Sequence, residues 1–211
     1  LDNLEVPILD GSAAPFIEMI EKAGRRRQQR RRRVMEIVEP LEMREGGKFI
    51  GIYPCSEYRL HYAIDFPHPV IGRQHFHFTL TPDSYRRELA PARTFGFLAD
   101  FDAMRRQGLI RGGSLDNAVV LDHERVVNGG LRFGDEFVRH KMLDLVGDLA
   151  LLGSPLRAEV RADRAGHALH TALVQRLLAA PRHWRWAEAV PATPTPLLAS
   201  APAAGMRAYT E

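Results

Sequence analysis

One helical stretch in the second half of the chain carries side chains that can do metal chemistry. At about 3.6 residues per turn, residues 136–153 (EFVRHKMLDLVGDLALLG) separate an apolar face from a polar face. The apolar face is Val138, Met142, Leu145, Leu149 and Leu152, and the polar face is His140, Asp144 and Asp148. His140 and Asp144 are four residues apart, so their side chains can reach one ion from successive turns. The alternative is a solvated helix face with a local His–Asp contact.

Four segments, in this order and spacing, resemble one family of enzymes. They are RTFGF (93–97), GGSLDNAVVLD (112–122), GLRFGDEFVRHKMLDLVGDLALLG (130–153) and AGHAL (165–169). A fifth segment, EVPILDGSA (5–13), is similar to the first domain of the same family. The family is the zinc-dependent UDP-3-O-acyl-N-acetylglucosamine deacetylase of lipid A biosynthesis, and the resemblance covers residues 1–178.

The resemblance assigns a role to five side chains. It implies that His140 and Asp144 are zinc ligands. A bound zinc ion acidifies water and polarises a carbonyl, which the hydrolysis of an unactivated acetamide requires. It implies that Thr94 donates a hydrogen bond to the tetrahedral oxyanion, and that His167 stabilises this oxyanion and protonates the departing amine. Asp148 would orient His167. Taken singly, these last three have ordinary alternatives: a strand threonine, a helix start and a solvated helix residue.

Further positions match the family's substrate-binding residues. Residues 97–122 correspond to an inserted β-α-β unit that forms an apolar passage for the fatty acyl chain. Lys141 would bind the diphosphate as a point charge. The matching substrate-binding positions are Lys141, Phe95, Phe101, Gly113, Ser114 and Val120. A solvated lysine and a plain Gly-Gly turn are the alternatives at Lys141 and Gly113.

The resemblance also implies residues that are not found in the sequence. In the family, the first domain supplies a third zinc ligand, a histidine directly preceded by a glutamate that serves as general base. No Glu-His pair occurs here, and the chain starts at Leu1. We therefore expect the C-terminal part of a deacetylase, nearly inactive alone. The alternative is an inactive remnant that binds a nucleotide-sugar or an acyl chain.

The order of the elements predicts an α+β fold of a sheet with helices. We expect a first-domain remnant and Arg-rich linker over residues 1–33, a second domain over 34–186 and a disordered tail over 187–211, where Ala, Pro and Thr dominate. Strands are predicted at 34–43, 49–53, 58–66, 75–81, 118–122, 124–128 and 156–163, and helices at 15–23, 100–107, 136–153 and 166–178.

Composition sets broad limits on the class of protein. The chain has 211 residues, 45% of them hydrophobic, which is enough to bury a sizeable core. The single cysteine, Cys55, excludes an internal disulfide and favours a reducing, cytoplasmic compartment. No run of about 18 apolar residues is present to span a membrane. We expect a monomer that acts on a small UDP-sugar.

The net charge of +3 is concentrated in one place. Seven arginines lie in the nine residues 25–33, and the rest of the chain is net negative. Such a run can bind nucleic acid or an anionic membrane. Because no interleaved aromatic residues or nucleic-acid motif accompany it, we favour a solvated linker. Nucleic-acid binding would show a steep dependence on salt.

Other histidines raise smaller questions. His170 stands where the family usually has asparagine, which leaves the role of this neighbour open. His75 and His77 would share one face of a strand and can pair on a metal ion, or they are ordinary surface histidines. The ligand types suit zinc, and Fe²⁺ tolerates the same imidazole and carboxylate groups.

Overall fold

The computed structural model describes residues 7–24, 26, 28–100 and 117–188. The elements, in chain order, are α1 (Ala14–Ala23), β1 (Arg33–Ile37), β2 (Leu41–Glu45), β3 (Lys48–Tyr53), β4 (Tyr58–Phe66), β5 (Gly72–Thr79), α2 (Pro82–Ser84), the π-helical turn η1 (Tyr85–Leu89), β6 (Phe95–Phe97), β7 (Val119–Leu121), α4 (Glu136–Leu149), the 3₁₀ turn η2 (Ala150–Leu152), β8 (Leu156–Asp163), α5 (His167–Ala179), the 3₁₀ turn η3 (Pro181–His183) and β9 (Trp184–Glu188).

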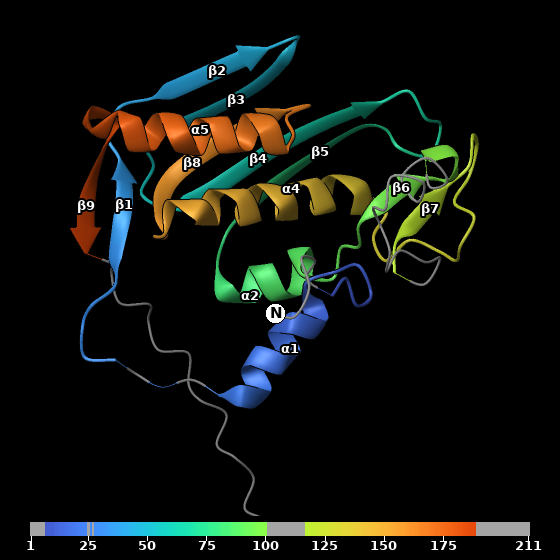
Figure 1. Cartoon of the computed structure of the whole chain (residues 1–211), viewed down its shortest axis with the longest axis horizontal. Coiled ribbons are helices and arrows are strands. Elements are labelled where there is room, and N and C mark those ends of the chain that lie inside the picture. Colours follow the sequence, from blue (N-terminus) through green and yellow to red (C-terminus); the bar gives the residue numbers. More distant parts are fainter. Residues whose placement is uncertain (1–6, 25, 27, 101–116, 189–211) are drawn as a thin grey trace, which may run out of the picture.

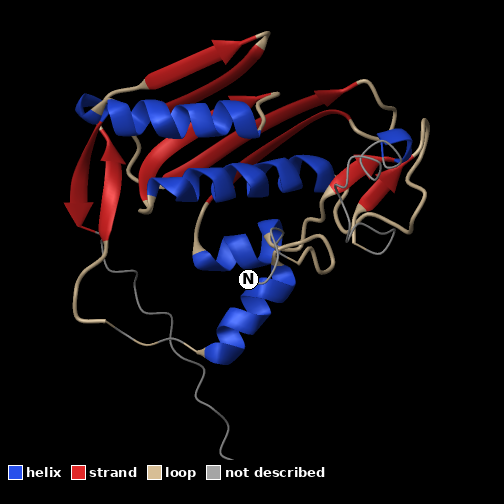
Figure 2. Ribbon diagram, viewed as in Figure 1, coloured by secondary structure: helices blue, strands red, loops and turns tan. Residues whose placement is uncertain are grey.

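A seven-stranded mixed sheet carries α4 and α5 on one face (Figure 1). Strand β8 is central: it pairs with β3 in antiparallel and with β4 in parallel orientation, and the hairpins β2–β3 and β4–β5 continue the sheet on its two sides. Helix α4 packs on β4 and β5, and α5 packs on β2 and β3. Figure 2 shows these two layers, so the predicted α+β fold is confirmed.

Alternation along the strands explains why one face of the sheet is covered. In β4, Leu60, Tyr62 and Ile64 are buried, whereas their neighbours point to the other face. The buried set meets the apolar face of α4, where Val138, Met142 and Leu145 are fully buried. Burying each large apolar side chain contributes about 1.5–3 kcal/mol. The predicted apolar face of this helix is confirmed.

A small parallel sheet of β6 and β7 lies at one end of the molecule, with Phe95 opposite Val119 and Phe97 opposite Leu121. Parallel strands require a crossover connection, and residues 98–118 provide it. Most of this connection, 101–116, lies outside the described residues. Phe101, Gly113, Ser114 and nearly all of the helix predicted at 100–107 fall there.

The single strand predicted at residues 34–43 is wrong. The structure has two strands, β1 and β2, separated by residues 38–40. Pro40 lacks the N–H that a sheet ladder uses, and the two halves have different partners. Strand β1 pairs with β8 and β9, while β2 pairs with β3.

The strand predicted at residues 124–128 is also wrong. Only Val126 bridges to Leu121. Side chains replace the ladder on both sides of it: Asp122 Oδ1 accepts from the backbone N–H groups of Glu124 and Arg125, each at 2.8 Å, and Asn128 Oδ1 accepts from Val120 N at 2.7 Å. Such local side-chain bonds compete with strand pairing.

The predicted start of the tail, residue 187, is too early. Ala187 and Glu188 belong to β9, an unpredicted strand that pairs with β1 over its whole length. Arg33 lies over the ring of Trp186, 4.5 Å from its centroid, and Arg31 forms an exposed ion pair with Glu188 at 3.0 Å. Two arginines of the basic run therefore lie against β9. Residues 189–211, predicted to be disordered, lie outside the described residues.

The N-terminal described segment is fixed against the β6 end of the molecule. Thr94 N donates to Gly11 O at 2.8 Å, and Arg132 forms an ion pair of 2.8 Å with Asp10. Helix α1 follows, and none of its residues is fully buried; Ile20 is 59% exposed. Within the described ranges, no helix combines the length and the apolar composition needed to cross a membrane.

Candidate active site

The polar face of α4 is largely enclosed rather than solvated. His140 is only 8% exposed, and the side chains of Asp144 and Asp148 are 16% and 18% exposed. The segment 92–95 covers one side of this face, because Ala92 O bonds to His140 and the Phe95 ring lies 6.4 Å from the imidazole. The start of α5 covers the other side.

His140 presents one free nitrogen to this enclosure. Its Nδ1–H donates to the carbonyl of Ala92 at 3.1 Å, which fixes the tautomer and leaves the lone pair on Nε2. Burial lowers the pKa of His140, and the nearby Asp144 carboxylate only partly opposes this effect. The imidazole is therefore neutral at physiological pH, which is the form that binds metals.

The spacing between His140 and Asp144 fits two ligands on one ion. His140 Nε2 lies 3.4 Å from Asp144 Oδ1. Zinc binds imidazole nitrogen and carboxylate oxygen at about 2.0–2.2 Å in tetrahedral geometry, which places two ligand atoms about 3.4 Å apart. Lys141 Nζ binds the second oxygen, Oδ2, at 2.8 Å and so orients the carboxylate. The described residues thus supply two donors that suit a zinc ion.

A hydrogen-bond network adjoins this pair. Asp148 Oδ2 accepts from His167 Nδ1 at 2.7 Å and from His170 Nδ1 at 2.8 Å. The other ring nitrogen of His167, Nε2, then lies on the side of Asp144, 3.9 Å from Oδ2. Its side chain is 65% exposed, so a ligand from solvent can reach it. Positions predicted from both helices therefore meet at one place.

Asp148, His167 and His170 form the one group of three or more potential metal donors found within the described part of the chain, with ligand atoms within 4.8 Å of one another. A carboxylate only accepts hydrogen bonds, so both Nδ1 atoms act as N–H donors to Asp148 and carry no free lone pair. We therefore regard this group as a hydrogen-bond network and the His140–Asp144 pair as the better metal site.

The other histidines assemble no such group in the residues that are described. His77 meets His61 across the β4–β5 hairpin, Nδ1 to Nδ1, and His75 accepts a hydrogen bond from Arg73 Nε at 3.2 Å. The suggested His75–His77 metal pair therefore has no close third ligand.

A buried ion pair, which was not predicted, holds the RTFGF segment against α4. Glu136 is fully buried and accepts from Arg93 N at 3.0 Å, Arg93 Nε at 2.9 Å and Arg132 N at 2.6 Å. Burial alone would raise the pKa of Glu136, yet these hydrogen bonds and the charge of Arg93 hold it below its usual value. The pair fixes the backbone at Arg93, directly before Thr94, and the Thr94 carbonyl accepts from Val119 N at 2.7 Å. Thr94 is thereby placed next to Ala92 and Phe95, both of which contact His140.

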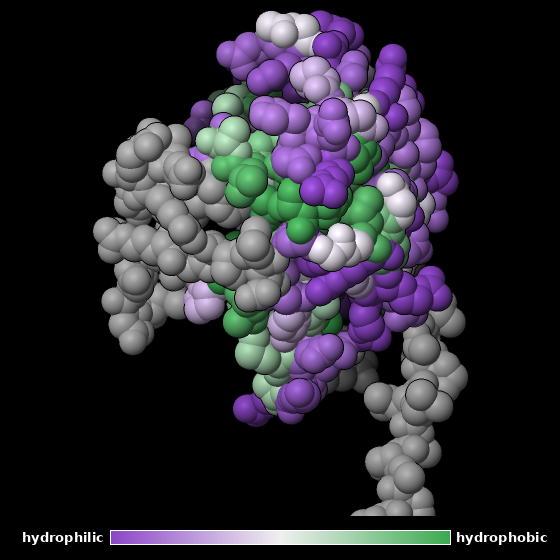
Figure 3. Space-filling model, turned by 90° about the vertical axis from the view of Figure 1, so that its right-hand side faces the viewer, coloured by the Kyte–Doolittle hydropathy of each residue, from purple (hydrophilic) through white to green (hydrophobic). Residues whose placement is uncertain are grey.

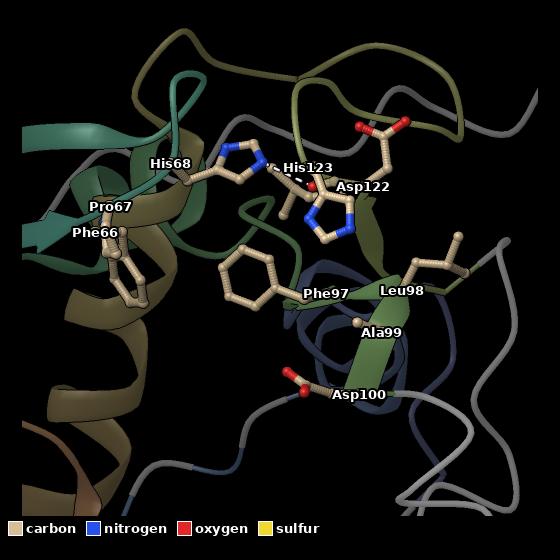
Figure 4. Close-up of a pocket in the computed structure, with 10 residues that line it drawn as sticks. Phe66, Pro67, His68, Phe97, Leu98, Ala99, Asp100, Asp122 and His123 are labelled. Atoms are coloured by element: carbon tan, nitrogen blue, oxygen red, sulfur yellow. Dashed lines mark hydrogen bonds between the residues drawn. The ribbon is translucent and has the colours of Figure 1, made fainter.

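An apolar hollow of about 620 Å³ opens at the β6–β7 end. Its described lining is Phe66, Pro67, His68, Phe97, Leu98, Ala99, Asp100, Leu121, Asp122 and His123 (Figure 4). His68 Nε2 bonds to Asp122 O at 2.8 Å along its rim. Figure 3 shows hydrophobic surface gathered on this end of the molecule. Val120, a predicted lining position, is buried in β7, and its neighbour Leu121 lines the hollow instead.

Lys141 lies at a second hollow, of about 370 Å³, together with two further cations, Lys48 and Arg164. Its ammonium group also lies 5.7 Å from the centroid of the Phe95 ring. Two predicted substrate-binding residues, Lys141 and Phe95, are therefore neighbours of each other and of His140.

Comparison with known proteins points to one family of enzymes. The family model described as UDP-3-O-acyl N-acetylglycosamine deacetylase matches residues 1–179. A protein of Solibacter usitatus named UDP-3-O-acyl-N-acetylglucosamine deacetylase is 52% identical over 182 residues, 86% of this chain and 61% of its own length. Proteins of the same name from Anaeromyxobacter sp. and Phenylobacterium zucineum are each 46% identical, over 86% and 88% of this chain. The chain spans 60–64% of the length of these curated relatives.

Proposed function

The chain belongs to the UDP-3-O-acyl-N-acetylglucosamine deacetylase family, and we propose that it carries the second-domain half of a zinc-dependent amidohydrolase centre. The proposed reaction is hydrolysis of the acetamide of UDP-3-O-acyl-N-acetylglucosamine, which releases acetate and a free amine in the cytoplasm. The observation that carries this proposal is that a metal-competent pair on α4, His140 and Asp144, lies beside the carboxylate-oriented imidazole of His167 at the start of α5.

His140 Nε2 and an Asp144 oxygen are the proposed zinc ligands. When bound, zinc supplies Lewis-acid polarisation of the amide and acidification of water. The chain's own residues set up the site: Ala92 O fixes the His140 tautomer, and Lys141 holds the Asp144 carboxylate. Fe²⁺ suits the same donors. Catalytic zinc sites usually have three protein ligands, so a third one has to join this pair.

His167 and Thr94 are proposed to act on the reacting carbonyl. With Nδ1–H donated to Asp148, His167 can carry its second proton on Nε2, on the side of Asp144, and deliver it to the departing amine. Thr94, held beside Ala92 and Phe95, would donate its hydroxyl proton to the developing oxyanion.

The two hollows suit the two ends of the proposed substrate. Three cations, Lys48, Lys141 and Arg164, line the second hollow and outnumber its one carboxylate, Asp65, so that the lining suits a diphosphate. The Phe66–Phe97 hollow is apolar enough for a fatty acyl chain. These positions support a nucleotide-sugar that carries an acyl chain as the substrate class.

The test is zinc content and acetate release, measured on this chain and on the longest reading frame that contains it. In that frame, His140→Ala and Asp144→Ala should each abolish tight zinc binding and turnover. His75→Ala, at an exposed histidine away from the site, is the matched control and should leave both unchanged. Full zinc stoichiometry and normal turnover in His140→Ala would sink the proposal.

We expect the chain alone to be close to inactive, because it contains no Glu-His pair to supply the family's general base and third ligand. Losing positioned proton transfer lowers rates about 10²- to 10⁴-fold. Wild-type-like turnover of this chain at saturating zinc would show that the base has been assigned to the wrong place.

A second candidate, a binding module without catalysis, is favoured only by the 620 Å³ apolar hollow. It predicts that the longest reading frame binds UDP-3-O-acyl-N-acetylglucosamine, measured by calorimetry, with no acetate released at any zinc concentration. Acetate release that depends on His140 and Asp144 excludes it.

A further inference from the structure

His170 is almost completely enclosed, with a side chain that is 1% exposed, and both of its ring nitrogens have partners. Nδ1 lies 2.8 Å from Asp148 Oδ2, and Nε2 lies 3.0 Å from the hydroxyl of Tyr62. The Tyr62 hydroxyl also contacts Ala165 O at 2.8 Å, on the turn that leads into α5. A continuous chain of contacts therefore runs from the sheet, through His170, to the carboxylate that holds His167.

The protonation pattern of this chain of contacts can be worked out from the donors. Burial lowers the pKa of His170, which the hydrogen bond to Asp148 only partly opposes, so the ring is neutral and has one N–H. Asp148 can only accept, so this proton is on Nδ1. Nε2 then carries the lone pair, and the Tyr62 hydroxyl shares its single proton between Ala165 O and His170 Nε2. One oxygen, Asp148 Oδ2, thus receives N–H bonds from two imidazoles, one buried and one exposed.

The exposed partner cannot fix this arrangement by itself. His167 is the first residue of α5, and its side chain is 65% exposed. Water can replace its hydrogen bond, and an aspartate side chain can rotate. His170 lies one turn further along α5 and is held by Tyr62 from β4, so it keeps Oδ2 at a fixed position under His167.

We propose that His170 is a positioning residue: through Asp148 it fixes the orientation and tautomer of His167, and Tyr62 fixes His170 in turn. The proposal rests on the proposed function only for its catalytic consequence. The orientation of His167 is a property of this chain and can be measured without any deacetylase activity.

The direct test is the tautomer of the His167 and His170 rings, read from ¹⁵N chemical shifts of this chain at a pH where both rings are neutral. A free imidazole favours the Nε2–H form, so Nδ1–H at both rings is the expected and diagnostic result. His167→Gln assigns the His167 signals. Nε2–H as the major form at either ring of the wild-type chain overturns the proposal.

Three substitutions at residue 170 separate its two contacts. His170→Asn puts an amide N–H near the position of Nδ1 and keeps a donor to Asp148. His170→Gln puts it near Nε2 and keeps only a group facing Tyr62, and His170→Leu keeps neither. We expect His167 to remain Nδ1–H with Asn and to shift to mainly Nε2–H with Gln and Leu. An unchanged His167 tautomer in both Gln and Leu variants that fold contradicts the proposal.

Kinetics of the longest reading frame give the catalytic consequence. His170→Gln should lower kcat about 10- to 100-fold with KM and zinc content unchanged, as for other residues that orient an active group. His170→Asn should restore most of the lost turnover. Equal losses in Asn and Gln variants would indicate a merely structural role and overturn the proposal. If no variant, nor the wild type, releases acetate, the proposed function fails while the tautomer test still decides the role of His170.

Discussion

His140 Nε2 faces Asp144 Oδ1 across 3.4 Å, one helical turn apart on α4. The separation is longer than a hydrogen bond and equal to that of two ligands on a tetrahedral zinc ion. Because the other imidazole nitrogen is bonded to Ala92 O, the ring cannot turn toward another partner without leaving that carbonyl unsatisfied. The pair is therefore preorganised for an ion.

The first prediction concerns the groups around the reacting carbonyl. In the longest reading frame, Thr94→Val and His167→Gln should each lower turnover on the order of 10²- to 10³-fold, with zinc retained, because each removes one preorganised donor. Asp148→Asn should lower it by about 10- to 100-fold, since Asp148 acts through His167. Steady-state acetate release and zinc analysis check this. Unchanged turnover in both Thr94→Val and His167→Gln would mean that these two side chains do not lie around the reacting carbonyl.

The second prediction concerns the Arg93–Glu136 pair, whose side chains are 14% and 0% exposed. Arg93→Met leaves a buried carboxylate without its counter-ion and should lower the free energy of unfolding by about 3 kcal/mol. Adding Glu136→Leu should recover part of this loss. The matched control is Arg31→Met, at a pair that is 72% and 71% exposed, which should change stability by less than about 1 kcal/mol. Unfolding free energies are measured by urea titration. Equal losses in Arg93→Met and Arg31→Met would show that the buried pair contributes no more to stability than the exposed pair.

The third prediction is the pH dependence of that pair. The pKa of Glu136 is lower in the folded chain than in the unfolded one, so the unfolded state binds the proton more readily. The contribution of Glu136 to the free energy of unfolding is then fully present above its ordinary pKa of 4.5 and is lost as pH falls through the lower folded value. The difference in unfolding free energy between wild type and Glu136→Gln should therefore shrink from pH 6 toward acid. A difference that stays constant over this range would contradict the assignment.

The fourth prediction concerns Gly11, where the backbone has φ +82° and a Cβ atom would overlap the carbonyl oxygen of Asn117. Gly11→Ala should cost about 2–4 kcal/mol, from the left-handed conformation together with the clash. Gly46, with φ +52° and open space around it, isolates the first contribution, and Gly46→Ala should cost about 1 kcal/mol. Equal destabilisation in the two variants would show that the approach of Gly11 to Asn117 is not tight.

The regular parts of the fold were predictable because they obey simple periods. Strand β4 and the core of α4 follow alternation and 3.6-residue spacing, and the structure reproduces them. The wrong strand predictions occur where an interaction with residues outside the segment decides its structure. Residues 34–43 form two strands on either side of Pro40, and these strands pair with different neighbours in the sheet. Hydrogen bonds to the Asn128 side chain take the place of the strand predicted at residues 124–128. Strand β9 forms because it can pair with the free edge of β1. The sequence of Trp184–Glu188 does not indicate this pairing.

The residue types of the candidate site could be predicted from the sequence. The hydrogen bonds between these residues could not. The spacing of His140 and Asp144 on a helix follows from sequence alone. That Asp148 is shared by two imidazoles depends on how α5 crosses α4, which helical periodicity does not specify. Glu136 lies in the first turn of α4, where the helix dipole favours an acid, so nothing in its sequence position indicates its burial against Arg93.

The most direct measurement is anomalous diffraction at the zinc absorption edge from crystals of the longest reading frame grown with zinc. A single strong peak is expected about 2.0–2.2 Å from His140 Nε2 and from one oxygen of Asp144, with His167 still bonded to Asp148. A peak centred instead among Asp148, His167 and His170, or no peak at saturating zinc, would contradict the assignment of the metal to the His140–Asp144 pair.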